Sequence, residues 1–162
     1  MSHRLEEYAD IEEELVALLK NLLAELPPNA ASLEVRRAGR DGVVATLKPA
    51  NRAAASIVVH AENGLALVDF SFGEYEPTWE LPWEGYNLKP SKKELLQEVE
   101  EMCRAVIAGH CEHRRGLLSV RGTIHVGNRP YRVTHWLVFR TAPRLHGTRE
   151  YESYVEPQPK SR

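Results

Sequence analysis

The sequence predicts an α+β protein with an antiparallel β-sheet of about six strands and two helices packed on one face, in the order α-β-β-β-β-α-β-β. Two segments carry apolar residues at helical spacing, several others alternate between apolar and polar residues, and the tight-turn pair Asn63-Gly64 joins two of the alternating segments. With 162 residues, the chain fits one domain. We expect this domain to span 1–149 and a loose tail, with prolines and charges, to follow at 150–162.

The first helix is expected from Leu5 to Leu26, where apolar residues recur every three or four positions. Its acidic residues lie mainly in the first turns, where the helix dipole stabilises negative charge. Pro27 and Pro28 end the helix, because proline cannot donate the backbone hydrogen bond that a continuing helix needs. The expected apolar positions are Leu5, Tyr8, Ile11, Leu15, Leu18, Leu22 and Leu26.

Two short strands, 33–37 and 43–48, are expected to form the first hairpin. A two-residue turn at Asp41-Gly42 would mix charged and apolar side chains on both faces of this hairpin. A three-residue loop from Arg40 to Gly42, with Gly42 in the left-handed conformation, separates them. We therefore predict the longer loop, with Leu33, Val35, Val43, Ala45 and Leu47 on one face.

A second hairpin is expected from 56–61 and 65–72, because Asn63-Gly64 between them is a strong two-residue turn pair. One face would then carry Ile57, Val59, Ala61, Ala66, Val68 and Phe70, and the other would carry Val58, His60, Leu65, Leu67 and Asp69. Both faces are largely apolar, so we expect this hairpin to lie centrally and to be covered on both sides.

The second helix begins at a capping box, Ser91-Lys92-Lys93-Glu94, and Gly109 ends it. Its buried stripe is expected to comprise Leu95, Val99, Met102 and Val106. Two long strands follow at 118–126 and 131–140. Their core face is expected to hold Val120, Ile124, Val126, Tyr131, Val133, Leu137 and Phe139, and their outer face Arg121, Thr123, His125, Arg132, Thr134, Trp136 and Arg140.

Charge is distributed unevenly along the chain. Residues 1–100 hold 10 basic and 18 acidic side chains, a net charge of −8, whereas residues 101–162 hold 11 and 5, a net charge of +6. From Arg104 to Arg149 there are nine arginines, no lysine and one acidic residue, Glu112. Such an asymmetry fits an anionic partner, but it also arises when the two halves of a chain pair with each other in one fold, which is our first interpretation.

The segment 73–87 combines aromatic and acidic residues with two prolines and has no basic residue. Tyrosine and tryptophan dominate protein interfaces, and an acidic rim attracts basic partners. We interpret the segment as a recognition loop for a basic protein, with the candidate contacts Tyr75, Glu76, Trp79, Glu80, Trp83, Glu84 and Tyr86. In the alternative interpretation Trp79 and Trp83 cover the core and the glutamates are simply solvated.

A second candidate surface is the outer face of the last hairpin, where Arg121, His125, Arg132 and Trp136 would bind nucleic acid through charge and stacking. The sequence pI near 6.4 is far from the basic character typical of a nucleic-acid binder, so we rank this alternative below a solvated face.

Three smaller clusters are also candidates for chemistry. His110-Cys111-Glu112-His113 offers metal donors, but its spacing matches no structural zinc module. His60 and Asp69 are expected diagonally on one hairpin face, without an assignable nucleophile. His135 is expected to be a buried core histidine. We predict no metal and no cofactor.

Glycine-rich phosphate loops, HExxH, paired CxxC and GxSxG are missing from the sequence, so binding is a better expectation than catalysis. We therefore expect a non-catalytic domain that recognises a basic protein. Its acidic character is similar to that of immunity proteins, the small acidic partners of basic toxins, by analogy alone. A nucleic-acid module and a small-ligand or hydrolytic domain stay open as alternatives. The N-terminus has no signal-peptide features, so we expect a cytoplasmic protein with free thiols and no membrane contact.

Overall fold

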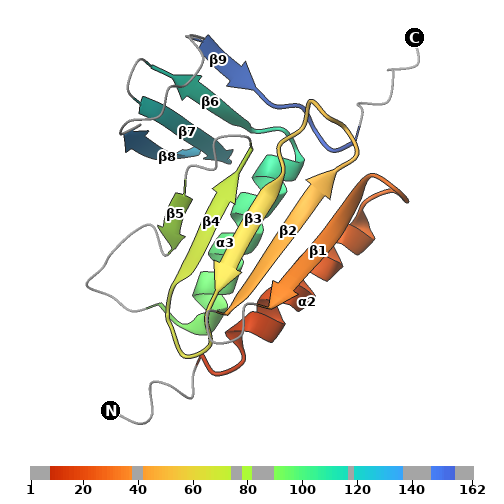
Figure 1. The fold of residues 1–162 in the computed structure, drawn as a ribbon, viewed down its shortest axis with the longest axis vertical. Helices are drawn as coiled ribbons and strands as arrows, with labels where there is room; N and C mark the ends of the chain where they lie inside the picture. Colours follow the sequence, from red (N-terminus) through yellow and green to blue (C-terminus); the bar gives the residue numbers. More distant parts are fainter. Residues whose placement is uncertain are drawn as a thin grey trace.

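A computed structural model describes residues 8–37, 42–73, 78–81, 90–116, 119–136 and 147–155. It confirms the α+β class, with two helices and nine strands among these residues. The strands form two antiparallel sheets, of five and four strands, instead of the single six-stranded sheet that the sequence predicts. Figure 1 shows the smaller sheet at one end of the larger one, with both helices behind the larger sheet.

The larger sheet contains five strands whose spatial order follows the sequence: β1 (Ala31–Arg37), β2 (Val43–Pro49), β3 (Ile57–Ala61), β4 (Val68–Phe72) and β5 (Thr78–Leu81). Burial alternates along β3, with Ile57, Val59 and Ala61 buried and the two residues between them half-buried. The expected central position of this hairpin is confirmed. The expectation of cover on both sides is wrong, because the second face stays partly exposed.

The smaller sheet has the order β8-β7-β6-β9, where β6 is Cys111–Arg115, β7 is Ser119–Val126, β8 is Arg129–Trp136 and β9 is Gly147–Glu150. The predicted hairpin is β7 and β8, closed by the two-residue turn Gly127-Asn128, since Val126 pairs with Arg129. Pairing of Ile124 with Tyr131 confirms the predicted division of faces over 119–136, although Thr123 of the outer face is buried. Leu137, Phe139 and Arg140 lie outside the described residues. Strands β6 and β9 are not among the predicted elements.

The two helices are α2 (Ile11–Glu25) and α3 (Lys92–Ile107). Helix α2 contacts β1, β2 and β3, and α3 contacts β4, β5 and also β7 of the smaller sheet. Helix α2 begins later than the expected Leu5, because Tyr8 lies in a turn before it, and residues 1–7 lie outside the described part. The capping box of α3 is confirmed, with the Ser91 hydroxyl accepting from the Glu94 backbone and the Glu94 carboxylate accepting from the Ser91 backbone.

In both hairpins predicted for the larger sheet, the side chains lie on the predicted faces. The observed pairing register differs from the predicted register by two residues. Arg37 pairs with Val43, and Ala61 pairs with Val68, so each loop is longer than predicted. The predicted left-handed conformation of Gly42 is present, with φ of +84°. Asn63-Gly64 does form a turn, but it sits inside a longer loop rather than closing the hairpin alone. Displacement by two preserves the faces because side chains alternate with a period of two.

The chain after β9 packs against the domain, contrary to the loose tail expected from residue 150. Tyr151 and Tyr154 are buried, and the Tyr154 hydroxyl donates to the backbone oxygen of Ala55 at 2.7 Å. Ala54 forms a parallel bridge with Glu152. The described domain therefore extends at least to residue 155, and residues 156–162 lie outside the described part.

Candidate anion-binding site

Trp79 is a core residue. Its side chain is 0% exposed and lies between Phe72, stacked at 5.3 Å between ring centroids, and Phe70, edge-on at 6.3 Å. The interpretation of Trp79 as a partner-binding anchor is therefore wrong, and the alternative of a core cover holds for this residue. Glu80 is exposed on the opposite side of β5. The other candidate contacts, Tyr75, Glu76, Trp83, Glu84 and Tyr86, lie outside the described residues.

His60 and Asp69 lie directly opposite each other on β3 and β4, rather than diagonally. Nδ1 of His60 is 3.3 Å from Oδ2 of Asp69, and their side chains are 37% and 39% exposed. This pair lies on the half-exposed face of the larger sheet. In this setting it has the geometry of a polar cross-strand pair.

The two cysteines and the histidines beside them do not converge on one point. Cys111 and His113 are buried on one side of β6, while Glu112 between them lies on the other side. Burial raises the pKa of the Cys111 thiol to about 12 and also raises the pKa of Cys103. Within the described ranges, no three histidine, cysteine or acidic side chains are placed to hold a metal ion.

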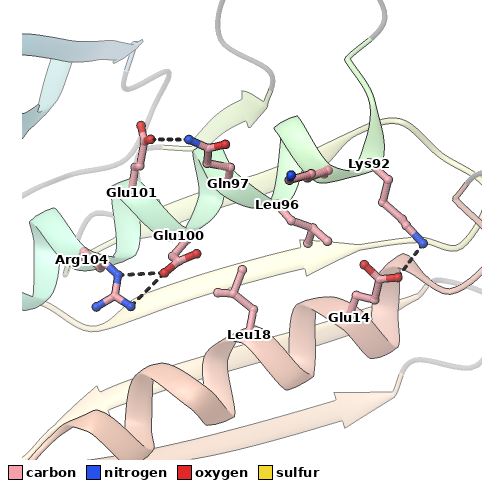
Figure 2. A pocket seen from close by; sticks show the side chains of 9 residues that line it. Glu14, Leu18, Lys92, Leu96, Gln97, Glu100, Glu101 and Arg104 are labelled. Atoms are coloured by element: carbon pink, nitrogen blue, oxygen red, sulfur yellow. Dashed lines mark hydrogen bonds and ion pairs between the residues drawn. The ribbon is translucent and has the colours of Figure 1, made fainter.

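A groove of about 560 Å³ lies between α2 and α3, with Leu18 and Leu96 facing each other across it (Figure 2). An ion pair stands near each end of the groove. The Lys92 ammonium is 2.6 Å from the Glu14 carboxylate, and Arg104 donates to both oxygens of Glu25 at 2.7 and 2.9 Å. The hydrogen bonds from Arg104 hold the pKa of Glu25 below its usual range. These ion pairs join the two helices, and we assign no ligand to the groove.

The outer face of the smaller sheet is different, because its arginines are not neutralised in this way. One cross-strand row runs Thr148, Arg114, Arg121, Thr134 over β9, β6, β7 and β8. Arg114 and Arg121 thus lie directly opposite each other, both exposed, and like charges in this position destabilise a sheet. Neither forms an ion pair with a carboxylate among the described residues.

A hollow of about 660 Å³ opens beside this arginine pair. It is lined by the end of β6 and the start of β9, which lie on the side of the smaller sheet away from α3 (Figure 1). Three arginines, two hydroxyl residues and two glycines line it: Arg114, Arg115, Gly116, Ser119, Arg121, Gly147 and Thr148. None of these described lining residues is acidic. The hollow therefore concentrates positive charge and hydrogen-bond donors in one place, which suits an anion.

The acidic residues nearest to this hollow along the strands are Glu112 and Glu150, which pair with each other in the next row of the same face. They lie on β6 and β9, whereas β7 and β8 contain no acidic residue. Arg132 and His125, two of the predicted nucleic-acid contacts, are exposed on that acid-free half of the face. Trp136, another of the four predicted contacts, ends β8, and its side chain lies outside the described part of the structure.

The buried side chain of His113 holds β6 against the larger sheet. The His113 ring stacks on Phe72 of β4 at 4.5 Å and lies 2.8 Å from the Tyr151 hydroxyl through Nδ1. Gly73 allows this close approach, since a Cβ there would lie 2.4 Å from the Tyr151 hydroxyl oxygen. The residue after this anchor is Arg114. The arginine pair is thus carried by a strand that is fixed to both sheets.

The structure brings Arg121, His125 and Arg132 to one face, as the sequence predicts, and adds Arg114 and Thr148 to it. Arg115 pairs with the core residue Val120 and so belongs to the other face of β6, although it also lines the hollow. The sequence contains an indication of these additional residues, because no acidic residue occurs between Glu112 and Glu150. The sequence predicts no strand at β6, so the arginines of β6 have no predicted neighbours.

Comparison of the chain with protein-family models, with curated proteins and with solved structures finds no match. In the described part of the chain, neither helix is both long and apolar enough to span a bilayer.

Proposed function

We propose that the protein is a non-catalytic module that binds single-stranded nucleic acid on the outer face of its smaller sheet. The observation that supports this best is the directly opposed pair Arg114 and Arg121, for which the described residues supply no carboxylate partner. Two guanidinium groups held side by side on a rigid sheet suit phosphate oxygens, which they contact through paired N–H donors.

The low overall pI is compatible with this function, because salt screens the electrostatic interaction between charges that lie far apart. At physiological salt, the Debye length is about 8 Å, so an exposed phosphate interacts mainly with the face that it touches. Acidic residues of the first half also form ion pairs away from the smaller sheet, as Glu25 does with Arg104 of α3 and Glu34 does with Lys48 of β2. Arg121, His125 and Arg132 then provide the next contacts across β7 and β8 for a bound strand.

The test is the salt dependence of binding. A short labelled oligonucleotide is titrated with the protein in fluorescence anisotropy at about 50, 100 and 200 mM salt. If Arg114 and Arg121 each contact a phosphate, the R114A/R121A variant should bind more weakly and its log–log salt slope should fall by about 1.4 in magnitude, since each contact contributes about 0.7 for a single strand.

The matched control is R36A/R52A, which removes two exposed arginines outside the smaller sheet and changes the net charge equally. It should leave the affinity and the slope nearly unchanged. Absence of binding at the lowest salt, or an equal loss in both double variants, would refute the function.

Recognition of a basic protein by segment 73–87 is the other candidate function. Glu80 supports it as an exposed carboxylate, but the burial of Trp79 removes one of its two tryptophan anchors. It is therefore our second proposal. A hydrolytic role for His60 and Asp69 has no nucleophile assigned to it. The cytoplasmic location expected from the sequence stays a proposal.

A further inference from the structure

We infer that the arginine-lined hollow takes a terminal phosphate, so that the protein binds the phosphorylated end of a nucleic-acid strand in preference to its interior. This inference rests on the proposed function and specifies which part of the strand the hollow holds. The observations that carry it are the number of guanidinium groups around one hollow, the hydroxyls beside them and the position of the two acidic residues on the same face.

The charge of the hollow matches a phosphomonoester better than a phosphodiester. A terminal phosphate carries about −1.5 to −2 at neutral pH and has three free oxygens, whereas an internal phosphodiester carries about −1 and has two. Arg114, Arg115 and Arg121 all line the hollow. The opposed guanidinium groups of Arg114 and Arg121 already carry two positive charges, which one terminal phosphate can balance and one phosphodiester cannot, and each carries several N–H donors in a fixed plane.

Hydroxyl groups complete the donor set. Ser119 and Thr148 line the hollow between the arginines, and Thr148 lies directly opposite Arg114 across β6 and β9. A third hydroxyl, that of Thr134, accepts a hydrogen bond of 3.4 Å from Nε of Arg121. Because that contact uses Nε, the outer nitrogens of the Arg121 guanidinium are left to meet a phosphate.

Among the described residues around the hollow, the charges favour one direction for a strand that leaves it. Glu112 and Glu150 stand in the adjacent row on β6 and β9 and would repel a phosphate placed there. No acidic residue interrupts β7 or β8, where Arg132 and His125 are exposed. A strand that begins in the hollow can therefore continue over β7 and β8 without passing the two glutamates on β6 and β9.

The experiment uses three labelled oligonucleotides of one sequence: one with hydroxyl groups at both ends, one with a 5′-phosphate and one with a 3′-phosphate. The label is internal, so that both ends stay free. In fluorescence anisotropy, at least one of the phosphorylated forms should bind about 10-fold to 100-fold more tightly than the hydroxyl form, which is the range expected for hydrogen bonds to a charged group. The R114Q variant should abolish this preference.

The matched control is R132Q, which removes an exposed arginine of the same face outside the hollow. It should weaken all three oligonucleotides by a similar factor and preserve their ratio. Thermal melting of both variants checks that they are folded, and R121Q repeats the test from the opposite strand. Equal affinity for all three oligonucleotides would overturn the inference and leave the proposed function standing, whereas failure to bind any of them would overturn both.

Discussion

The hydroxyl of Tyr151 lies 2.8 Å from Nδ1 of His113, and this contact joins the segment after β9 to the middle of β6. Both side chains are buried, and Phe72 of the larger sheet packs against both of their rings. The guanidinium of Arg149 lies over the Tyr151 ring, 5.1 Å from its centroid. The contact is thus part of the packing that holds the smaller sheet, and with it the arginine-lined hollow, against the larger one.

The first prediction concerns this contact. The Tyr151→Phe variant keeps the ring but removes the hydroxyl, which leaves Nδ1 of His113 buried without that hydrogen-bond partner. The free energy of unfolding should fall by about 1 to 3 kcal/mol, the penalty for a buried polar group that loses its partner. Urea titration followed by far-UV circular dichroism measures this change.

Tyr131→Phe is the matched control, because Tyr131 is only partly buried in β8. The free energy of unfolding should fall less for Tyr131→Phe than for Tyr151→Phe. An unchanged midpoint for Tyr151→Phe would mean that the contact with His113 adds nothing to stability. The linkage of the two sheets would then depend on ring packing alone.

Much of the fold was predictable because burial imposes a period on the sequence. The apolar stripe of α3 and its capping box needed only local residues, and both are present. In the hairpins, side-chain parity decided the faces correctly but not the loop lengths, since a displacement by two residues leaves every side chain on the same face. Arg37 therefore pairs with Val43 across a loop longer than predicted.

Strands β6 and β9 escaped prediction because their sequences, CEHRR and GTRE, carry little apolar alternation. Both strands pair within the sheet, and β6 also packs through His113 on Phe72 and Tyr151, which are distant from β6 in the sequence, so no local pattern records these contacts. The candidate site depends on the same strands, so only its β7 and β8 residues could be predicted. The burial of Trp79 could be predicted in part from the sequence, because the apolar residues Trp79 and Leu81 alternate with Glu80, which is exposed.

The second prediction separates the two tryptophans of segment 73–87. Trp79→Ala should lower the free energy of unfolding by about 3 to 5 kcal/mol, because it removes a large, fully buried side chain that packs on two phenylalanines. Trp83→Ala tests the second proposed function, in which Trp83 is an anchor for a basic protein. An anchor residue should leave the melting temperature nearly unchanged and weaken partner binding by about 2 kcal/mol or more.

Differential scanning fluorimetry of both variants provides the comparison. A melting temperature that falls as far for Trp83→Ala as for Trp79→Ala would show that both tryptophans belong to the core. The acidic segment would then have no tryptophan anchor, and its role in recognition would be refuted.

The last prediction concerns the buried thiols. Burial raises the pKa of Cys111 from its ordinary 9.0 to about 12 and raises that of Cys103 as well, so in the folded protein both thiols stay protonated at pH values where the unfolded chain has lost these protons. Their contribution to stability is fully present below about pH 9 and is lost as the pH rises from there towards 12. Each thiol should steepen the fall in unfolding free energy by up to about 1.4 kcal/mol per pH unit in this window.

Urea titrations at several pH values between 7 and 10.5 measure the slope. The Cys103→Ala variant should show a shallower fall above about pH 9 than the native chain, because one of the two titrating thiols is gone. Comparing slopes rather than absolute stabilities removes the constant cost of trimming a buried side chain. Both cysteines are free in the structure, so reductant should leave the curves unchanged. Identical slopes for the two proteins would contradict the raised pKa of Cys103, and a loss of stability in reductant would contradict its free thiol.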